Sequence, residues 1–140
     1  MEVTFHFSHA FFEDSVNNFK SGSVIHTVEV NDPERFGVAE LDDNMNVLSV
    51  EEKPNSPKSN NAITGFYLFD KTIFKKIENL EPSDRGEYEV TDIIKQYLDD
   101  SQLKAFKLDH IWADTGTISS LSDASKTVSD YLKENNINYL

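Results

Sequence analysis

Apolar residues recur along the chain at two spacings, and these predict strands alternating with helices. Near the N-terminus, alternation with polar residues predicts a short strand containing Val3, Phe5 and Phe7. Ser8 then suits a helix N-cap, and the helix it begins would end by Gly22. The apolar face of this helix would be formed by Phe12, Val16 and Phe19.

The rest of the chain gives further elements by the same rules. In order, they are a strand at 24–30, a break at 31–33, a hairpin of 37–41 and 47–50 around 42–44, a polar loop at 53–61, a buried strand at 62–69, helices near 73–77 and 90–97, a strand at 103–108 and a last helix capped by Thr117. This mixture predicts an α/β or α+β fold, with helices beside a mixed sheet that has an antiparallel part. No repeat or linker divides the chain, so residues 1–140 are expected to form a single domain.

Charge and composition narrow the classes of partner. The net charge is -12, which repels nucleic acid and anionic membranes at long range, so neither is expected as a partner. A small phosphorylated ligand needs only a local cluster of basic groups and stays open. The absence of cysteine suits the cytoplasm, and residues 1–5 lack the basic and apolar regions of a signal peptide. We expect a soluble cytoplasmic protein.

Three segments place polar residues where predicted strands end or helices begin. The first is Glu51-Glu52-Lys53-Pro54, after the strand at 47–50. Because proline follows it, Lys53 is expected to have an extended backbone. Lys53 could then hold a phosphate while Glu52 accepts hydrogen bonds from sugar hydroxyls. A solvated, charged strand end is the alternative.

The second segment runs from Arg85 to Asp92, at the entry to a helix. Arg85 could bind a phosphate through two hydrogen bonds, with help from the nearby helix N-terminus. Alternatively, the acidic residues of this segment could simply favour the first turn of the helix.

The third segment is Trp112-Ala113-Asp114-Thr115-Gly116-Thr117. Asp114, followed by a turn into a helix, could present a carboxylate to Mg²⁺. An Asx-turn before the helix N-cap would also explain it. The four histidines show no shared metal-binding spacing, so we expect them to be structural or exposed: His6, His9, His26 and His110.

Six motifs in order resemble those of the sugar-1-phosphate nucleotidyltransferases, most of all the glucose-1-phosphate thymidylyltransferases. They are 32–38 (DPERFGV), 51–54 (EEKP), 57–60 (PKSN), 63–67 (ITGFY), 85–92 (RGEYEVTD) and 112–117 (WADTGT). The resemblance extends from about Phe12 to about Leu132. It implies the C-terminal half of that family's Rossmann-like mixed sheet, flanked by helices. It also implies a reaction in which dTTP and glucose-1-phosphate give dTDP-glucose and pyrophosphate.

By resemblance, every motif except that at 57–60 contributes a residue to the substrate site. Lys53 and Arg85 would hold the sugar phosphate as the catalytic pair, and Glu52 would bind sugar hydroxyls. Asp114 would be one of two Mg²⁺ carboxylates. The remaining substrate-binding residues would be Phe36, Gly37, Ile63, Tyr67 and Trp112.

Two features of the family have no match in this sequence. They are the Gly-rich loop that binds the triphosphate and a Gly-Asp-Asn, whose place is taken by Ser8-His9-Ala10. We therefore expect a family member represented by its sugar-phosphate-binding half and inactive alone. The alternative is a non-catalytic sugar-phosphate-binding or assembly module. A sheet lacking its other half would expose an edge strand, so a homo-oligomer is expected.

Overall fold

The computed structural model describes residues 6–109 and 112–136, with side chains from residue 12 onward. Its described parts form two compact units, divided between His110 and Ile111. The first unit holds a sheet with its helices, and the second holds the helix α4 (Ile118–Glu134). The expectation of a single domain stays a prediction.

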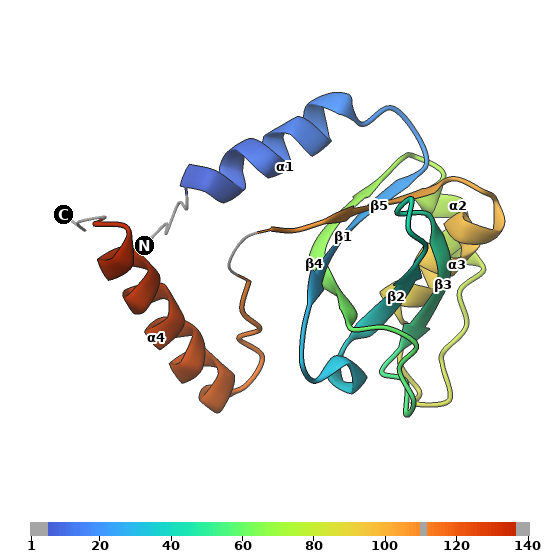
Figure 1. The fold of residues 1–140 in the computed structure, drawn as a ribbon. Coiled ribbons are helices and arrows are strands. Elements are labelled where there is room, and N and C mark those ends of the chain that lie inside the picture. The colour runs from blue at the N-terminus through green and yellow to red at the C-terminus, as the bar shows by residue number, and fades with distance from the viewer. Residues whose placement is uncertain (1–5, 110–111, 137–140) are drawn as a thin grey trace. The chain divides into compact units, whose positions relative to one another are not determined.

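The first unit is built on a curled five-stranded sheet with the order β3-β2-β4-β1-β5 (Figure 1). β1 pairs antiparallel with β4 and parallel with β5, and β2 pairs antiparallel with both β3 and β4. The strands are β1 (Ser23–Glu29), β2 (Gly37–Leu41), β3 (Val47–Glu52), β4 (Asn61–Phe69) and β5 (Leu103–Lys107). The predicted hairpin and the three other strands inside the described part are confirmed, and so is the mixed α/β fold class.

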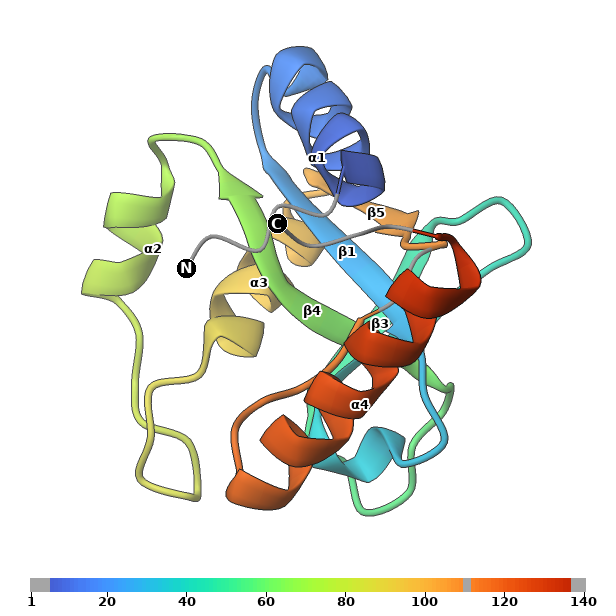
Figure 2. The same cartoon turned by 90° about the vertical axis from the view of Figure 1, so that its left-hand side faces the viewer.

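The helices of this unit cover the two faces of the sheet (Figures 1 and 2). On one face, Ile94 of α3 packs in the buried core with Ile25 and Ile63. On the other face, Phe12 of α1 contacts Phe66, with ring centroids 4.3 Å apart. The helices are α1 (His6–Asn18), the short helix α2 (Ile73–Glu78) and α3 (Val90–Asp99), together with the 3-10 turn η1 (Pro33–Arg35).

The start of the chain differs from the sequence expectation. His6, Phe7 and Ser8 lie within α1, so the helix begins earlier than the predicted cap at Ser8. The predicted strand at Val3 and Phe5 lies outside the described residues. The helix ends at Asn18 and not at Gly22. Gly22 instead has a φ of +79° and turns the chain into β1, where the left-handed conformation favours glycine.

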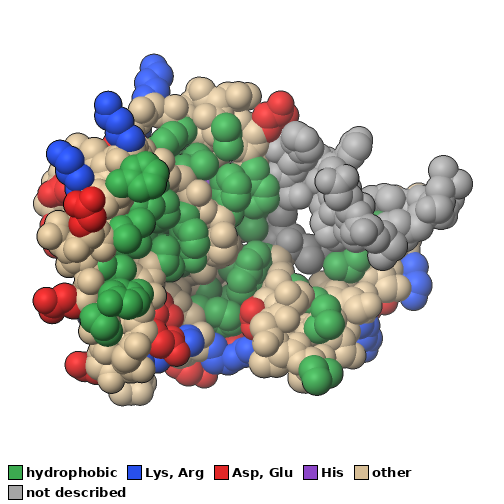
Figure 3. Space-filling view, turned by 180° about the vertical axis from the view of Figure 1, so that it is seen from behind, with side chains coloured by type: hydrophobic (Ala, Val, Ile, Leu, Met, Phe, Trp, Pro, Cys, Tyr) green, Lys and Arg blue, Asp and Glu red, His purple; other side chains and the backbone are tan. Residues whose placement is uncertain are grey.

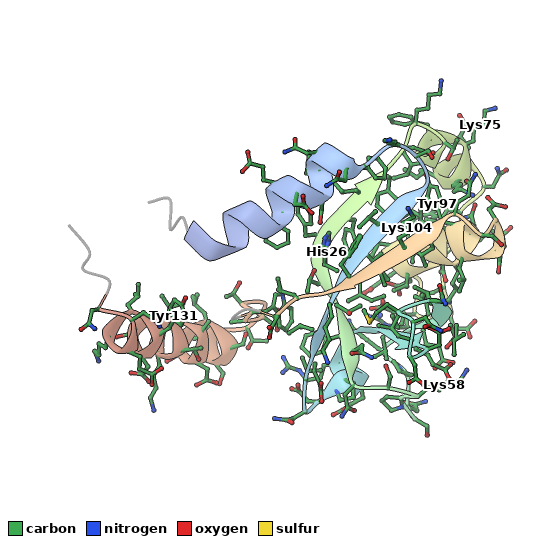
Figure 4. All side chains as sticks on the ribbon, turned by 45° about the horizontal axis from the view of Figure 1, so that its top comes forward. His26, Lys58, Lys75, Tyr97, Lys104 and Tyr131 are labelled. Atoms are coloured by element: carbon green, nitrogen blue, oxygen red, sulfur yellow. The ribbon has the colours of Figure 1, made fainter. Side chains whose placement is uncertain are left out.

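His26 joins α1 to the sheet. Its side chain points from β1 toward α1 (Figure 4), and its Nε2 lies 2.9 Å from the hydroxyl of Ser15. Its Nδ1 lies 3.3 Å from the carbonyl oxygen of Phe66. Burial lowers the pKa of His26, so the neutral ring is favoured in the folded chain. His26 is therefore structural, as the sequence predicted.

The second unit is capped as predicted. Thr117 is the N-cap of α4, and its side chain accepts a hydrogen bond from the Ser120 backbone N–H, while the Ser120 hydroxyl accepts one from the Thr117 backbone N–H. This reciprocal capping box satisfies two backbone N–H groups of the helix. None of the described helices has the length and apolar character that crossing a membrane requires.

Candidate functional site

Gly37 marks the point where four elements of the first unit meet. It is paired with Glu52 across β2 and β3. A Cβ atom placed on Gly37 would lie 2.8 Å from Cγ2 of Thr91, 3.2 Å from Oε2 of Glu52 and 3.7 Å from Cδ1 of Ile63. The ends of β2 and β3, the buried part of β4 and the N-terminus of α3 thus converge here. The absence of a side chain at Gly37 makes this close packing possible.

Tyr67 lies further along β4, opposite Ile25 of β1. Burial raises the pKa of its hydroxyl, and the negative charge of Glu52 raises it further. Its ring also packs against the core of the sheet. A half-buried tyrosine can offer both an apolar ring and a polar hydroxyl group to a ligand.

Arg85 supplies the positive charge of this region. Its Nη1 lies 3.1 Å from Oε1 of Glu89 and 3.8 Å from Oε1 of Glu52. Its Nη2 lies 2.9 Å from Oε2 of Glu87. The side chain of Arg85 is 39% exposed, so part of the guanidinium still faces solvent. We use the name candidate site for Gly37, Glu52, Ile63, Tyr67, Arg85, Glu89 and Thr91.

Glu89 and Thr91 are members of the candidate site that the sequence did not single out. Both stand in the 85–92 motif, where acidic residues at a helix start were expected to act on the first turn. Glu89 is the N-cap of α3, yet its side chain makes no capping bond and is turned to Arg85 instead. The Thr91 hydroxyl is buried and has no hydrogen-bond partner among the described residues. Only the fold shows what these side chains meet.

Lys53 lies next to the candidate site, but its backbone is not extended. Its φ is +40°, in the left-handed region, so the expectation drawn from the following proline is wrong. The Lys53 backbone N–H donates to the carbonyl oxygen of Phe36 over 2.9 Å, which holds the turn after β3 against the residue before Gly37. The Lys53 side chain is exposed. Left-handed backbone at a residue other than glycine costs about 1–2 kcal/mol, and such strain concentrates at functional sites.

The two remaining predicted residues lie in the second unit. Oδ1 of Asp114 accepts a hydrogen bond from the Gly116 backbone over 3.1 Å, which is the Asx-turn that the sequence allowed. Trp112 is half-buried. No group of three His, Asp or Glu side chains that could hold a metal occurs in the described part of the chain. One carboxylate does not make a metal centre, so we derive no chemical step through Mg²⁺.

The chemical groups of the candidate site favour one class of ligand. One arginine, a neighbouring lysine and a sugar-compatible pair of Glu52 and Tyr67 suit a phosphorylated polyhydroxyl compound. The family model described as "Nucleotidyl transferase" matches residues 5–131. The chain therefore belongs to the nucleotidyl transferase family.

Individual relatives agree with this assignment. The chain is 45% identical over 109 residues to a glucose-1-phosphate thymidylyltransferase from Neisseria gonorrhoeae, covering 76% of this chain and 38% of that protein. It is 42% identical over 120 residues to the bifunctional protein GlmU of Methanocaldococcus jannaschii. That match covers 85% of this chain and 29% of GlmU. A solved Bacillus anthracis structure, described as a putative glucose-1-phosphate thymidylyltransferase in complex with sucrose, is 39% identical in sequence and has a TM-score of 0.77. The match covers 94% of this chain and 51% of that one.

These relatives confirm the family resemblance and the nucleotidyltransferase sheet. The chain spans less than two fifths of the two curated relatives and about half of the solved one. What the complete relatives do therefore does not transfer directly to this chain.

Proposed function

We propose that this chain is the sugar-phosphate-binding part of a sugar-1-phosphate nucleotidyltransferase that uses glucose-1-phosphate and dTTP. The carrying observation is that Glu52 and Arg85, far apart in the sequence, lie 3.8 Å apart in the candidate site. A cation beside a carboxylate can bind the phosphate and the hydroxyls of one ligand. The identity to a thymidylyltransferase supports glucose-1-phosphate and dTTP over other pairs.

Each residue then has a role in ground-state binding and positioning. Arg85 and Lys53 hold the phosphate, which neutralises charge as its oxygen approaches the nucleotide phosphorus. Glu52 accepts hydrogen bonds from the sugar, and Ile63 and Tyr67 line its apolar face. Gly37 and Phe36 keep the backbone close to the ligand. Trp112 lies in the second unit, and its role beneath the sugar is expected from the family resemblance alone. Asp114 lies in the second unit, and its role as a Mg²⁺ carboxylate is expected from the family resemblance alone.

The nucleotide half of the reaction needs groups that we do not find in this sequence. The Gly-rich triphosphate loop of the family has no match here. We therefore expect no more than trace turnover from the chain alone. A cytoplasmic location and the absence of a nucleic-acid partner remain predictions, which rest on the lack of cysteine and on the net charge of -12.

A non-catalytic sugar-phosphate-binding module is the second candidate function. The missing triphosphate loop favours it, since binding needs only the candidate site. Pyrophosphate release from dTTP and glucose-1-phosphate, measured with the chain alone, tests the expected inactivity. Sustained release that depends on both substrates would contradict the expected inactivity and would support the enzyme.

Binding of glucose-1-phosphate tests the proposal directly. We expect saturable NMR shifts in the wild type, and Lys53→Ala should weaken binding by about tenfold, because a charge-assisted contact is worth roughly 1.5–3 kcal/mol. Lys107→Ala is the matched control. Lys107 lies on β5, outside the candidate site, and forms an ion pair with Glu29 of β1. The proposal fails if the wild type shows no shifts up to tens of millimolar ligand, or if both variants lose affinity equally.

A further inference from the structure

We infer that Glu89 is a positioning residue that holds Arg85 in the orientation needed to bind the sugar phosphate. The inference rests on the proposed function of Arg85 as a phosphate ligand. Glu89 itself is only 8% exposed, so we assign it no contact with the ligand.

One oxygen of Glu89 organises the loop that carries Arg85. Oε1 of Glu89 accepts hydrogen bonds from Nη1 of Arg85 at 3.1 Å and from the hydroxyl of Ser83 at 3.0 Å. The same hydroxyl accepts a weaker bond from the Arg85 backbone N–H at 3.3 Å. Glu89 therefore fixes both the side chain and the backbone of the arginine.

The loop itself is closed by its backbone. The Ser83 N–H donates to the carbonyl of Glu87 at 2.8 Å, and the Gly86 N–H donates to the carbonyl of Ser83 at 2.7 Å. Gly86 has a φ of +75°, which this tight turn requires. Arg85 is thus presented from a short, hydrogen-bonded loop, and Glu89 at the start of α3 anchors that loop to the helix.

Glu87 and Glu89 both bind the guanidinium of Arg85, but they differ in how strongly they can restrain it. Glu87 also bonds the guanidinium, but its side chain is 60% exposed, whereas that of Glu89 is 10% exposed. An exposed ion pair restrains an arginine weakly, while a buried, charge-assisted bond restrains it strongly. Glu87→Ala is therefore a control, because it removes an exposed carboxylate from the same guanidinium.

The sign of the effect separates positioning from simple electrostatics. Removing a negative charge beside an anion site should by itself strengthen anion binding. If Glu89 positions Arg85, its removal should instead weaken binding. We expect Glu89→Ala to weaken glucose-1-phosphate binding by about five- to tenfold, since one charge-assisted bond loses its preorganisation. Glu87→Ala should leave binding unchanged or strengthen it by up to about twofold. Glu89→Gln keeps an acceptor and should fall between wild type and Glu89→Ala.

Arginine NMR gives a reading that needs no ligand. The sequence holds two arginines, Arg35 and Arg85, so their Nε–H signals are readily assigned, and Arg35 serves as the internal reference. In wild type, the Arg85 Nε–H signal should lie away from the position of a freely rotating arginine. In Glu89→Ala, it should move to the position of a freely rotating arginine while the Arg35 signal stays in place.

The outcomes separate this inference from the proposed function. Failure of wild type to bind glucose-1-phosphate would refute the proposed function, and the Arg85 signal would then decide the positioning role by itself. An unchanged Arg85 signal in Glu89→Ala, or binding as tight as wild type, would overturn the inference. If Glu89→Ala does not fold, Glu89→Gln and Ser83→Ala decide, because each removes part of the same network.

Discussion

At the scale of single residues, Gly37 shows how the candidate site depends on a missing side chain. The methyl group of Thr91 fills the space in which a Cβ of Gly37 would lie, and Glu52 borders the same space. The sequence led us to expect that Gly37 lets a ligand approach the backbone. In the structure, Gly37 is also needed for packing, because the absence of its side chain lets the start of α3 approach β2.

We predict that Gly37→Ala destabilises the chain by about 1–3 kcal/mol, the usual range for overpacking a well-filled interior. The buried Thr91 and the adjacent Glu52 leave the new methyl no room. Gly65→Ala is the matched control, because a Cβ on Gly65 has no neighbour within 4 Å. Urea denaturation of both variants checks this. Equal stabilities of Gly37→Ala and Gly65→Ala would refute the packing account.

At the scale of elements, Asp70 links three segments at the other end of β4. Its carboxylate accepts hydrogen bonds from the Gly22 N–H at 2.7 Å, from the Thr72 N–H at 2.9 Å and from the Tyr97 hydroxyl at 3.1 Å. These bonds connect the entry to β1, the start of α2 and the last turn of α3. The hydrogen bond from the Thr72 side chain, followed by that from Gly22, lowers the pKa of Asp70 from 3.8 to about 2.

We predict that Asp70→Asn removes a pH-dependent part of the stability. Because the folded-state pKa is lowered, the carboxylate contributes stability that is fully present above pH 3.8 and is lost as the pH falls towards about 2. Wild type should therefore exceed Asp70→Asn in stability at pH 5, and the difference should shrink between pH 4 and 2. Denaturation across this range is the measurement, with Asp43→Asn in the exposed β2–β3 turn as control. A constant difference at every pH would count against the assignment.

At the scale of the whole molecule, β4 has an edge that lacks a partner. β2 pairs with β4 only at Val38 and Ala62, so residues 65–69 have no ladder partner on that side among the described residues. This stretch, Gly-Phe-Tyr-Leu-Phe, carries no charge, whereas β5 carries Lys104 and Lys107 and β3 ends in two glutamates. Charged side chains are the usual protection of exposed edges. Figure 3 also shows hydrophobic side chains gathered on one face. Large hydrophobic residues with exposed side chains include Phe74, Ile77 and Tyr88.

We predict that the chain self-associates, and that residues 65–69 of β4 take part. The uncharged strand edge favours pairing, while the net charge of -12 opposes it, so association should strengthen with salt. Light scattering should show masses above 16.0 kDa that rise with concentration. Hydrogen exchange should show added protection at 65–69 and none in β5. A single monomeric species at every concentration and salt level would refute this.

The sequence by itself determined the positions of the strands from 23 to 107, the hairpin, the capped helix α4 and the order of the family motifs. These features depend on local periodicity, on turn residues and on spacing, all of which can be read along the chain. Glu52 and Arg85 were named from their motifs in the same way.

Tertiary structure alone decided the rest. The left-handed backbone of Lys53 depends on its bond to Phe36, and the packing at Gly37 depends on Thr91. The task of Glu89 depends on where the 83–87 loop folds back onto α3. The contacts of Lys53 and Gly37 join segments distant in sequence, and that of Glu89 depends on how a nearby loop folds. Local patterns of hydrophobic and polar residues carry no information about such contacts.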